Sequence, residues 1–385
     1  MKIGVYLRDS LPEEGGAHTF ESAVAQQLSE LNGEHTFVVL AEQNIRCSLP
    51  VIRLKRTILH GVANRVCLAL SRPFLFDRGA ALRKHGIDLI YSPGPNTPCH
   101  GIPYVVTCWD LQHRLQPFFP EVSNVRIAGM SGWDHRERHF RTVLPRASCV
   151  ITGTDVGKSE VIHFYQLAPE RVAVIPFFAP TKLHHCAPQK PSWLPEGRFF
   201  VYPAQFWPHK NHRTLIDALK RLHDQGFDDV RLVLPGADKP EEFGTMKAVR
   251  SAAEKLSLTK SVFTPGFVSD CELRWLYENA VGLAFVSHFG PDNLPPLEAA
   301  SLGCPVIAAD VNGAREQLGD AAVFVNATDV DSVADALISV LSDSSLRDSL
   351  VAAGRKLVAA RTLKNYANKL DDVFDELASF RFFER

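Results

Sequence analysis

The sequence predicts an α/β protein with two Rossmann-like, doubly wound domains that face a cleft. Short apolar runs of strand length alternate with longer amphipathic runs along most of the 385 residues. A proline-rich stretch interrupts this alternation near the middle of the chain, and the alternation then starts again. Strand–helix–strand repeats are typical of a parallel sheet with helices on both faces, and a chain of this length exceeds one ordinary core.

The first domain is expected over residues 1–178. Its apolar runs predict strands at 2–7, 36–40, 87–91, 103–107, 148–152 and 172–175, with an amphipathic helix near 19–32. The N-terminal run is too short for the apolar region of a signal peptide, so we interpret it as the first strand.

A linker is expected over residues 179–198, which hold four prolines and little periodicity. The second domain is expected over residues 199–360, with strands at 199–204, 230–236, 281–287 and 305–310 and helices at 212–224, 272–280 and 295–303. Residues 361–385 contain a last helix, at about 361–379, that we expect to cross back to the first domain. Two joined domains of this kind place a ligand cleft at the carboxyl ends of their strands.

The composition excludes several classes of protein. The formal net charge is -1 and 22% of the residues are charged, so no global basic excess points to nucleic acid. The eight cysteines include no C-x-x-C pair, which argues against a disulfide framework or a zinc site and favours a reducing cytoplasm. No apolar run approaches the roughly 18 residues of a membrane span.

Residues 46–84 carry nine lysines and arginines against the single acidic residue Asp77, with apolar residues between them. Two interpretations stay open. The segment is either a helix with an ordinary solvated basic face or a surface that rests on the anionic inner face of the membrane, where each basic residue adds about 1 kcal/mol.

The most informative stretch runs from Ser287 to Ala300. A buried strand ends at Ser287, a loop rich in Gly, Pro and Asn follows, and a helix is expected to open at Pro295, since proline suits a first helical turn. The loop amides of Asn293 and Leu294, together with the helix start, form a natural seat for a diphosphate. We place Glu298 in the first turn, where it either hydrogen-bonds a diol such as ribose or only complements the helix dipole.

A second stretch, Tyr202-Pro-Ala-Gln-Phe-Trp-Pro-His-Lys-Asn-His212, also follows a strand and precedes a helix. Lys210 offers a point charge for a phosphate, and Gln205 and Asn211 offer amides. The alternative is a solvated loop lysine. Both stretches are expected at strand ends of one sheet, so they can converge on one ligand.

The first domain offers weaker signals. Gly15 and Gly16 follow the first strand, as in a loop that lets the backbone approach a phosphate or an acceptor, although an ordinary turn explains them equally well. Asp110 and His113 follow another strand and are candidates for positioning the acceptor hydroxyl or the donor sugar. Their alternative roles are a capping aspartate and a surface histidine.

These motifs resemble the family 4 retaining glycosyltransferases of the GT-B fold. The resemblance rests on P-H-K-N-H at 208–212, on F-G-P-D-N-L-P-P-L-E-A-A from 289, and on Gly313-Ala-Arg-Glu-Gln-Leu-Gly-Asp-Ala-Ala322. It implies transfer of a sugar from a nucleotide donor with retention of the anomeric configuration, without a protein nucleophile. Lys210 would contact the donor diphosphate, and Glu298 would contact the ribose.

The chain departs from the family pattern at two positions. The family's first glutamate, which is separated from the second by seven residues, falls on Gly290, and its usual arginine falls on Gln205. The F-G-P-x-N-x-P-P-L-E form resembles a sub-branch that includes bacterial polysaccharide mannosyltransferases. We hypothesise that Asp292 or Asn293 replaces the missing carboxylate.

The resemblance implies a GDP- or UDP-sugar donor, mannose being the first candidate, and a lipid-linked glycan acceptor of bacterial surface polysaccharide such as lipopolysaccharide. No metal or other cofactor is expected: His135 and His139 lie one helical turn apart, but no third ligand is evident. Two alternatives are a nucleotide-sugar epimerase on the same fold and a catalytically inactive nucleotide-sugar-binding protein.

Overall fold

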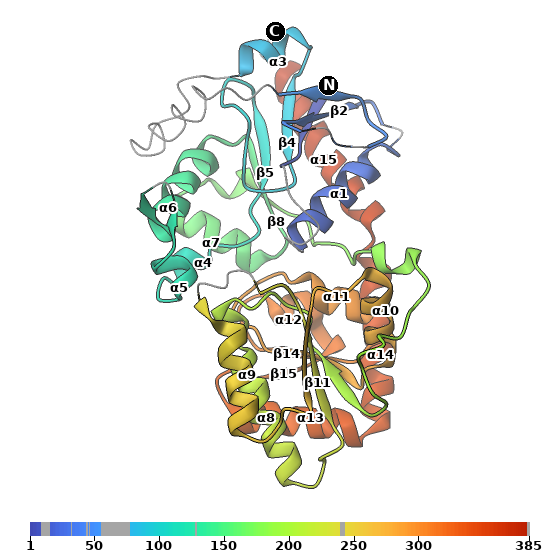
Figure 1. The fold of residues 1–385 in the computed structure, drawn as a ribbon. Helices are drawn as coiled ribbons and strands as arrows, with labels where there is room; N and C mark the ends of the chain where they lie inside the picture. The colour runs from blue at the N-terminus through green and yellow to red at the C-terminus, as the bar shows by residue number, and fades with distance from the viewer. Residues whose placement is uncertain are drawn as a thin grey trace. The chain divides into compact units, whose positions relative to one another are not determined.

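The computed structural model describes residues 1–8, 16–31, 33–43, 45, 47–54, 78–127, 129–238 and 243–382, of which 380–382 as backbone alone. The chain divides into two compact units. The first contains residues 1–118, 122–177 and 363–385, and the second contains 119–121 and 178–362. Each unit has one parallel sheet with helices on both faces, so the predicted fold class is confirmed (Figure 1).

The sheet of the first unit has seven strands, all parallel. Their spatial order is β3 (Val51–Arg53), β2 (Thr36–Ala41), β1 (Lys2–Tyr6), β4 (Leu89–Ser92), β5 (Tyr104–Thr107), β8 (Cys149–Thr152) and β9 (Val172–Val174). Six of these strands match the apolar runs of the sequence. The seventh, β3, was not predicted, because a three-residue edge strand that ends in an arginine gives no apolar period.

Helices α1 (Gly16–Leu28), α3 (Gly79–Lys84), α4 (Gln112–Leu115), α5 (Pro120–Ser123), α6 (Gly132–Val143) and α7 (Asp155–Tyr165) lie along the chain between these strands, with a short hairpin of β6 (Arg126–Ile127) and β7 (Met130–Ser131). Ser131 and Thr154 cap α6 and α7 by accepting hydrogen bonds from the first-turn amides.

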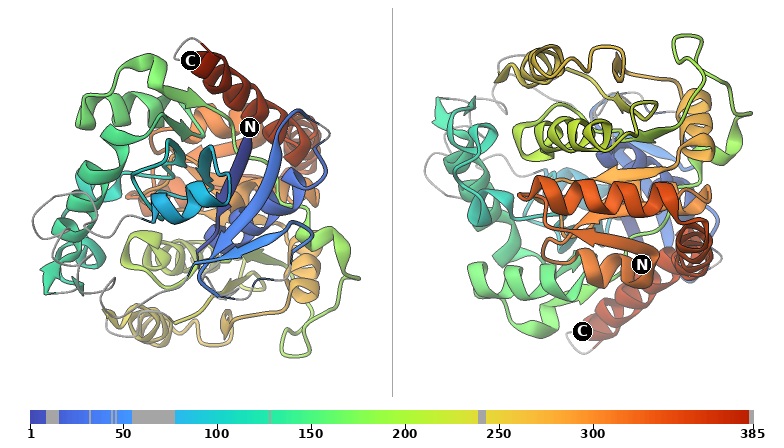
Figure 2. Two further views of the ribbon diagram at one scale, coloured as in Figure 1. Left: turned by 90° about the horizontal axis from the view of Figure 1, so that it is seen from above. Right: turned by 90° about the horizontal axis from the view of Figure 1, so that it is seen from below.

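The last helix, α15 (Leu363–Phe382), belongs to the first unit and lies beside α1 (Figures 1 and 2). Its buried face places Phe374 against Tyr91, with ring centroids 5.7 Å apart. The hydroxyl groups of Tyr366 and Tyr91 are 3.0 Å apart in a buried hydrogen bond. The chain therefore leaves the first unit, forms the second, and returns to complete the first core.

The second unit has a six-stranded parallel sheet in the order β12 (Val262–Gly266), β11 (Arg231–Pro235), β10 (Phe199–Val201), β13 (Gly282–Phe285), β14 (Val306–Ala309) and β15 (Ala322–Val325). The strands β12 and β15 at its two edges were not predicted. Pro265 obscures β12 in the sequence, and an edge position is where a strand tolerates proline.

The helices of this unit are α8 (His212–Asp224), α9 (Thr245–Lys255), α10 (Asp270–Asn279), α11 (Leu294–Ser301), α12 (Ala314–Leu318), α13 (Val330–Ser342) and α14 (Ser344–Ala360). The predicted helix 212–224 matches α8 to the residue. Ser269 and Glu272 form a reciprocal capping box at the start of α10.

Most of the basic segment 46–84 lies outside the described residues. Of its nine basic residues, four are described: Arg53, Arg78, Arg83 and Lys84. Arg78 pairs with Glu42 at 2.9 Å, and contact with a membrane stays a prediction. Within the described part of the chain, no helix combines the length and the hydropathy that crossing a lipid bilayer requires.

We predict that Phe374→Ala destabilises the first unit by about 3–5 kcal/mol, because its fully buried ring leaves a cavity against Tyr91 and Phe37. Urea unfolding measures the loss of stability. Limited proteolysis then shows whether the new cleavage sites lie in the first unit. Phe267→Ala is the control, since 57% of the Phe267 side chain is exposed. Equal stability of the two variants would contradict the role given to α15.

Candidate active site

The two motif loops of the second unit leave neighbouring strands, β10 and β13, at their carboxyl ends. They are hydrogen-bonded to each other: the His288 N–H donates to the His209 carbonyl at 2.8 Å. The Asn211 amide group donates to the Val286 carbonyl at 3.1 Å. The expectation that both stretches meet at one edge of one sheet is therefore confirmed.

Lys210 lies at this edge. It ends a short 3-10 turn, Pro208–Lys210, and Asn211 follows in the left-handed region with φ of 58°. Its ammonium nitrogen lies 5.4 Å from the centre of the Phe285 ring at the end of β13, and its carbonyl accepts a hydrogen bond from the Tyr202 hydroxyl at 2.8 Å. The Lys210 charge therefore lies at the end of β13, the strand from which the loop to α11 leaves.

The amide of Asn211 has a structural role rather than the ligand contact expected from the sequence. It donates to two backbone carbonyls, those of Val286 and Ala327, and its oxygen accepts from the Thr214 hydroxyl. The oxygen of Gln205 accepts from the Trp207 indole N–H at 2.6 Å. Asn211 therefore ties together the loops that follow β10, β13 and β15. We no longer assign its side chain to a contact with the ligand.

Helix α11 begins at Leu294, one residue earlier than expected, with Asn293 at the N-cap. Glu298 consequently lies in the second turn, which corrects its placement in the first. Because Pro295 and Pro296 have no N–H group, Leu294 supplies the single N–H among the first three helical residues. The Asn293 N–H donates to the Gln317 side chain at 3.2 Å, so this amide shapes the turn and does not face outward as expected.

Gly290, where the family pattern has a glutamate, adopts φ of +133°. A Cβ atom built at this position would lie 2.2 Å from the Asn293 side-chain nitrogen. That nitrogen donates to the Gly290 carbonyl at 2.6 Å and closes the turn. The shape of this loop therefore requires glycine at position 290, because any side chain there would strain the backbone and clash with Asn293.

Asp292 brings a carboxyl group into the same loop. One oxygen accepts from the Gln317 amide at 2.8 Å, and the other is buried without a hydrogen-bond partner among the described residues. Burial raises the pKa of Asp292 to about 7. A buried carboxyl with one unsatisfied oxygen is a candidate contact for a ligand hydroxyl.

Glu298 has a similar setting. Burial raises the pKa of Glu298 to about 7, although the Tyr277 hydroxyl donates to it at 3.3 Å and favours the ionised form. Tyr277 is itself fully buried on α10. Near neutral pH the group therefore changes between the carboxylate, whose two oxygens both accept hydrogen bonds, and the acid, one oxygen of which is a donor.

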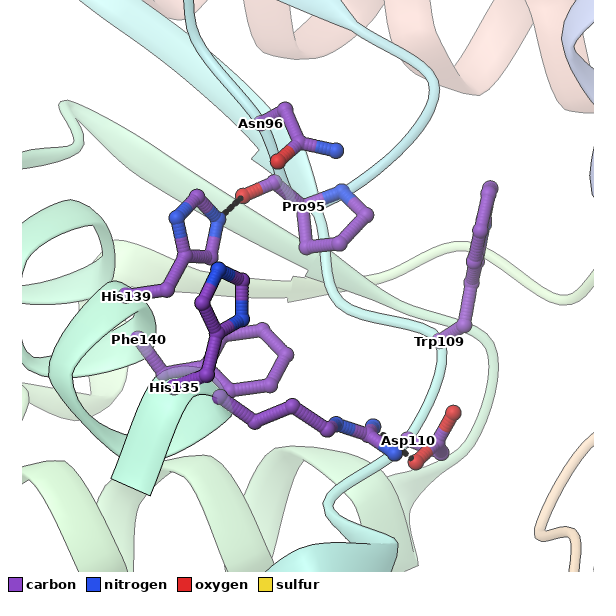
Figure 3. A pocket seen from close by; sticks show the side chains of 8 residues that line it. Pro95, Asn96, Trp109, Asp110, His135, His139 and Phe140 are labelled. Atoms are coloured by element: carbon purple, nitrogen blue, oxygen red, sulfur yellow. Dashed lines mark hydrogen bonds and ion pairs between the residues drawn. The ribbon is translucent and has the colours of Figure 1, made fainter. Parts of the chain in front are cut away.

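In the first unit, Asp110 lies on the wall of a pocket of about 260 Å³ (Figure 3). The pocket is lined by Pro95, Asn96, Trp109, Asp110, His135, Arg136, His139 and Phe140. The imidazole rings of His135 and His139 lie on one side and the Trp109 indole lies opposite. The indole N–H is buried and has no hydrogen-bond partner among the described residues.

Asp110 precedes the N-cap residue of α4, Leu111, and its carboxylate is held by the first amide of that helix and by an arginine. Its carboxylate accepts from the Gln112 N–H at 2.9 Å and from Arg136 at 2.6 Å. Burial acts to raise the pKa of Asp110, but Arg136 and the Gln112 amide outweigh burial and hold it below its ordinary value. Asp110 is therefore not the capping residue considered in the sequence, although it accepts from the first helical amide, and its ionised carboxylate borders the pocket.

His113 lies in the interior and not on a surface. Its ring is fully buried, stacks on Phe140, and contacts Glu137 at 3.1 Å and Tyr165 at 3.2 Å. Burial, aided by Arg136, lowers the pKa of His113 to about 4. Because no part of the ring reaches solvent, we withdraw His113 as a substrate contact and assign it to the packing of α6.

Gly15 lies outside the described residues, and Gly16 is the first residue of α1. The His139 Nε2–H donates to the Pro95 carbonyl at 2.9 Å, and burial lowers the pKa of His139 to about 4. Among the described residues, no three His, Cys, Asp or Glu side chains are placed to share a metal ion. The expectation that no cofactor takes part stays a prediction.

Gln317 is the residue of this site that the sequence reasoning missed. It lies within the segment 313–322 that resembles the family, about 24 residues after the turn that it contacts. A lone glutamine on a short helix gives no pattern of its own, because only the folded chain shows that its side chain is buried.

Two family models match this chain. One, described as Glycosyltransferase Family 4, matches residues 14–182, and the other, described as glycosyl transferases group 1, matches residues 187–357. The chain is 26% identical over 227 residues to the O-antigen chain mannosyltransferase B of Escherichia coli, covering 57% of this chain and 58% of that protein. It is 24% identical over 265 residues to the serotype-specific mannosyltransferase WbdA of Escherichia coli, covering 66% of this chain and 31% of that protein.

These matches thus span between about a third and somewhat over half of the relatives' lengths.

Solved structures share the fold over nearly the whole chain. WaaG, a glycosyltransferase involved in lipopolysaccharide biosynthesis, is 18% identical with a TM-score of 0.70, covering 96% of this chain and 99% of that one. HepE of Anabaena in complex with UDP-glucose is 18% identical with a TM-score of 0.72, covering 98% of this chain and 100% of that one.

The family models meet near the division between the two units and take in both motif loops of the second unit together with the pocket of the first. On this evidence the chain belongs to the glycosyltransferases that the two models describe, family 4 in its N-terminal half and group 1 in its C-terminal half.

Proposed function

We propose that this protein is a retaining hexosyltransferase that moves a sugar, mannose in the first place, from a nucleotide-sugar donor to a glycan acceptor in the synthesis of a bacterial surface polysaccharide. The observation that carries the proposal is that the loop bearing Lys210 and the loop leading to Leu294 and Glu298 on α11 leave neighbouring strands at one edge of the second unit's sheet and are hydrogen-bonded to each other. The names of the relatives, O-antigen mannosyltransferases, support the choice of sugar and of pathway class.

The chemistry follows from the charges at this edge. When the bond between the anomeric carbon and the diphosphate breaks, negative charge builds up on the leaving phosphate. The Lys210 ammonium and the positive end of α11 stabilise that charge without a metal ion. The acceptor hydroxyl attacks the anomeric carbon from the face that the diphosphate leaves, and its proton passes to the leaving phosphate oxygen. Glu298 holds the ribose diol.

The donor base is proposed from the relatives. GDP-mannose is the first candidate because O-antigen chain mannosyltransferase B and WbdA are named as mannosyltransferases, and UDP-sugars come second because HepE was solved with UDP-glucose. Thermal unfolding in the presence of GDP- and UDP-sugars separates the two, since a ligand at 100 times its Kd adds about 2.7 kcal/mol. Absence of any shift with all nucleotide sugars would overturn the proposal.

The acceptor is proposed to be a neutral sugar ring of a lipid-linked glycan, bound at the pocket that Trp109 and Asp110 border. An aromatic face, an ionised carboxylate and two imidazoles whose pKa values burial lowers suit hydroxyl groups rather than a charged ligand. A location at the cytoplasmic face of the membrane belongs to the same proposal.

Lys210→Ala is expected to lower the transfer rate at least about 10²-fold, because the leaving diphosphate loses a preorganised positive charge. Initial rates at saturating donor and acceptor measure the change. Lys220→Ala is the control, since Lys220 lies on α8 in a surface pair with Asp224. A wild-type rate in Lys210→Ala would remove the central assignment.

Asp292→Ala is expected to raise the donor KM about tenfold or more, because the buried carboxyl with an unsatisfied oxygen is proposed to bind a donor sugar hydroxyl. Asp320→Ala in the same unit is the control. Donor kinetics that stay unchanged in Asp292→Ala would exclude Asp292 as the substitute for the missing first glutamate.

The ribose contact predicts a pH dependence. Since burial raises the pKa of Glu298 to about 7, the group is protonated below that pH and accepts hydrogen bonds from a diol more weakly than the carboxylate does. The kcat/KM for the donor should rise as pH increases through about 7 and then level off. Glu298→Gln should lower the slope of log(kcat/KM) against pH by about one.

The exposed Glu254 provides the control variant Glu254→Gln for this profile. A pH profile of Glu298→Gln that retains the full wild-type slope would show that another group titrates.

Two rival functions are separated by simple incubations. A nucleotide-sugar epimerase converts the donor alone to its epimer, whereas a transferase needs the acceptor. A catalytically inactive binding protein shifts the unfolding temperature with nucleotide but turns over no acceptor.

A further inference from the structure

We infer that Gln317 is a positioning residue of the donor-binding turn, aiming the Leu294 N–H and orienting the Asp292 carboxyl group. The inference deepens the proposed function and rests on it for the identity of the ligand. Its basis is a set of three hydrogen bonds from one buried side chain to two consecutive residues, Asp292 and Asn293.

The Gln317 side chain is only 1% exposed, and glutamine is seldom buried unless its amide is paired. Its nitrogen donates to an Asp292 carboxyl oxygen at 2.8 Å and to the Asn293 carbonyl at 2.9 Å. Its oxygen accepts from the Asn293 N–H at 3.2 Å. Both amide hydrogens and the oxygen are thus used, and all of them are used on this turn.

Because the peptide bond is planar, the bond from Gln317 to the Asn293 carbonyl also restrains the turn that is proposed to bind the donor diphosphate. The Asn293 carbonyl and the Leu294 N–H belong to the same planar peptide group and point in opposite directions. A hydrogen bond that fixes the carbonyl therefore also fixes the direction of the N–H. Since Pro295 and Pro296 have none, this N–H is the one that the first three helical residues can offer to a phosphate.

The Asn293 carbonyl, as the N-cap carbonyl, also accepts the first backbone hydrogen bond of α11, so Gln317 adds a second bond that holds this peptide group. The Asn293 side chain, which stands at the N-cap, bonds to the Gly290 carbonyl and makes no cap bond to α11. Support comes instead from the 313–317 segment, which packs so closely that a Cβ on Gly313 would lie 2.7 Å from the Pro291 carbonyl oxygen. This close approach brings Gln317 within reach of the turn.

The side chain must be an amide. A glutamate at 317 keeps an acceptor for the Asn293 N–H but loses both donated bonds, and it brings a second carboxyl group to Asp292. A leucine loses all three bonds while filling a comparable space. The two variants therefore remove the same contacts by different means.

The test compares Gln317→Glu and Gln317→Leu with Gln225→Glu and Gln225→Leu, which make the same changes at an exposed glutamine of the same unit. The first measurement is amide hydrogen exchange, without ligand, in a peptide that covers residues 289–298. We expect exchange in this peptide to quicken at least about tenfold in both Gln317 variants, with the rest of the second unit unchanged. The Gln225 variants should match the wild type.

The second measurement separates positioning from general support of the fold. The Gln317 variants should raise the donor KM at least about tenfold while the acceptor KM stays within about twofold of the wild type. Faster exchange throughout the second unit, or equal changes in both KM values, would overturn the inference and leave Gln317 a packing residue. Unchanged exchange in the 289–298 peptide would overturn it as well.

Failure of the proposed function gives a different result. A wild-type protein that binds no nucleotide sugar ends the transferase assignment, whereas the exchange comparison still decides whether Gln317 holds the turn. If Gln317→Leu does not fold, the nearly isosteric Gln317→Glu carries both measurements.

Discussion

The site depends on a constraint of parallel sheets, which bring the carboxyl ends of neighbouring strands to one edge. In the second unit this places the loop after β10 beside the loop after β13, and the His209 carbonyl and the Asn211 amide bond them together. Lys210 sits between these two anchors in the chain. The hydrogen bonds that its two neighbours make therefore hold the backbone of Lys210 at this edge.

The same edge of the sheet combines positively charged groups with carboxyl groups, and the proposed ligand has parts that suit each. The ammonium of Lys210 and the start of α11 favour anions, while Asp292 and Glu298 carry carboxyl groups that burial keeps partly protonated near neutral pH. A diphosphate and a polyol can use this arrangement at once, because phosphate oxygens meet positive groups and hydroxyls meet carboxylates. The arrangement also explains why a side chain as costly to bury as Gln317 is retained in the core.

The sequence predicted the fold class and most central strands because buried parallel strands are continuous apolar runs. The strands that escaped, β3, β12 and β15, lie at sheet edges, where runs are short or contain proline. The two motif loops could be located because a strand, a Gly- and Pro-rich loop and a helix follow one another in each. Local detail could not be predicted. His113 is buried, and the side-chain amide of Asn211 and the backbone N–H of Asn293 are hydrogen-bonded within the protein, because of residues distant in sequence.

The position of α15 has a consequence for biosynthesis of the chain. The core of the first unit includes Tyr366 and Phe374, which follow the whole of the second unit in sequence. During synthesis from the N-terminus, residues 178–362 can complete their own core while the earlier sheet still exposes the surface around Phe20 and Tyr91. The part of the protein made first therefore cannot complete its core until the last helix has been synthesised.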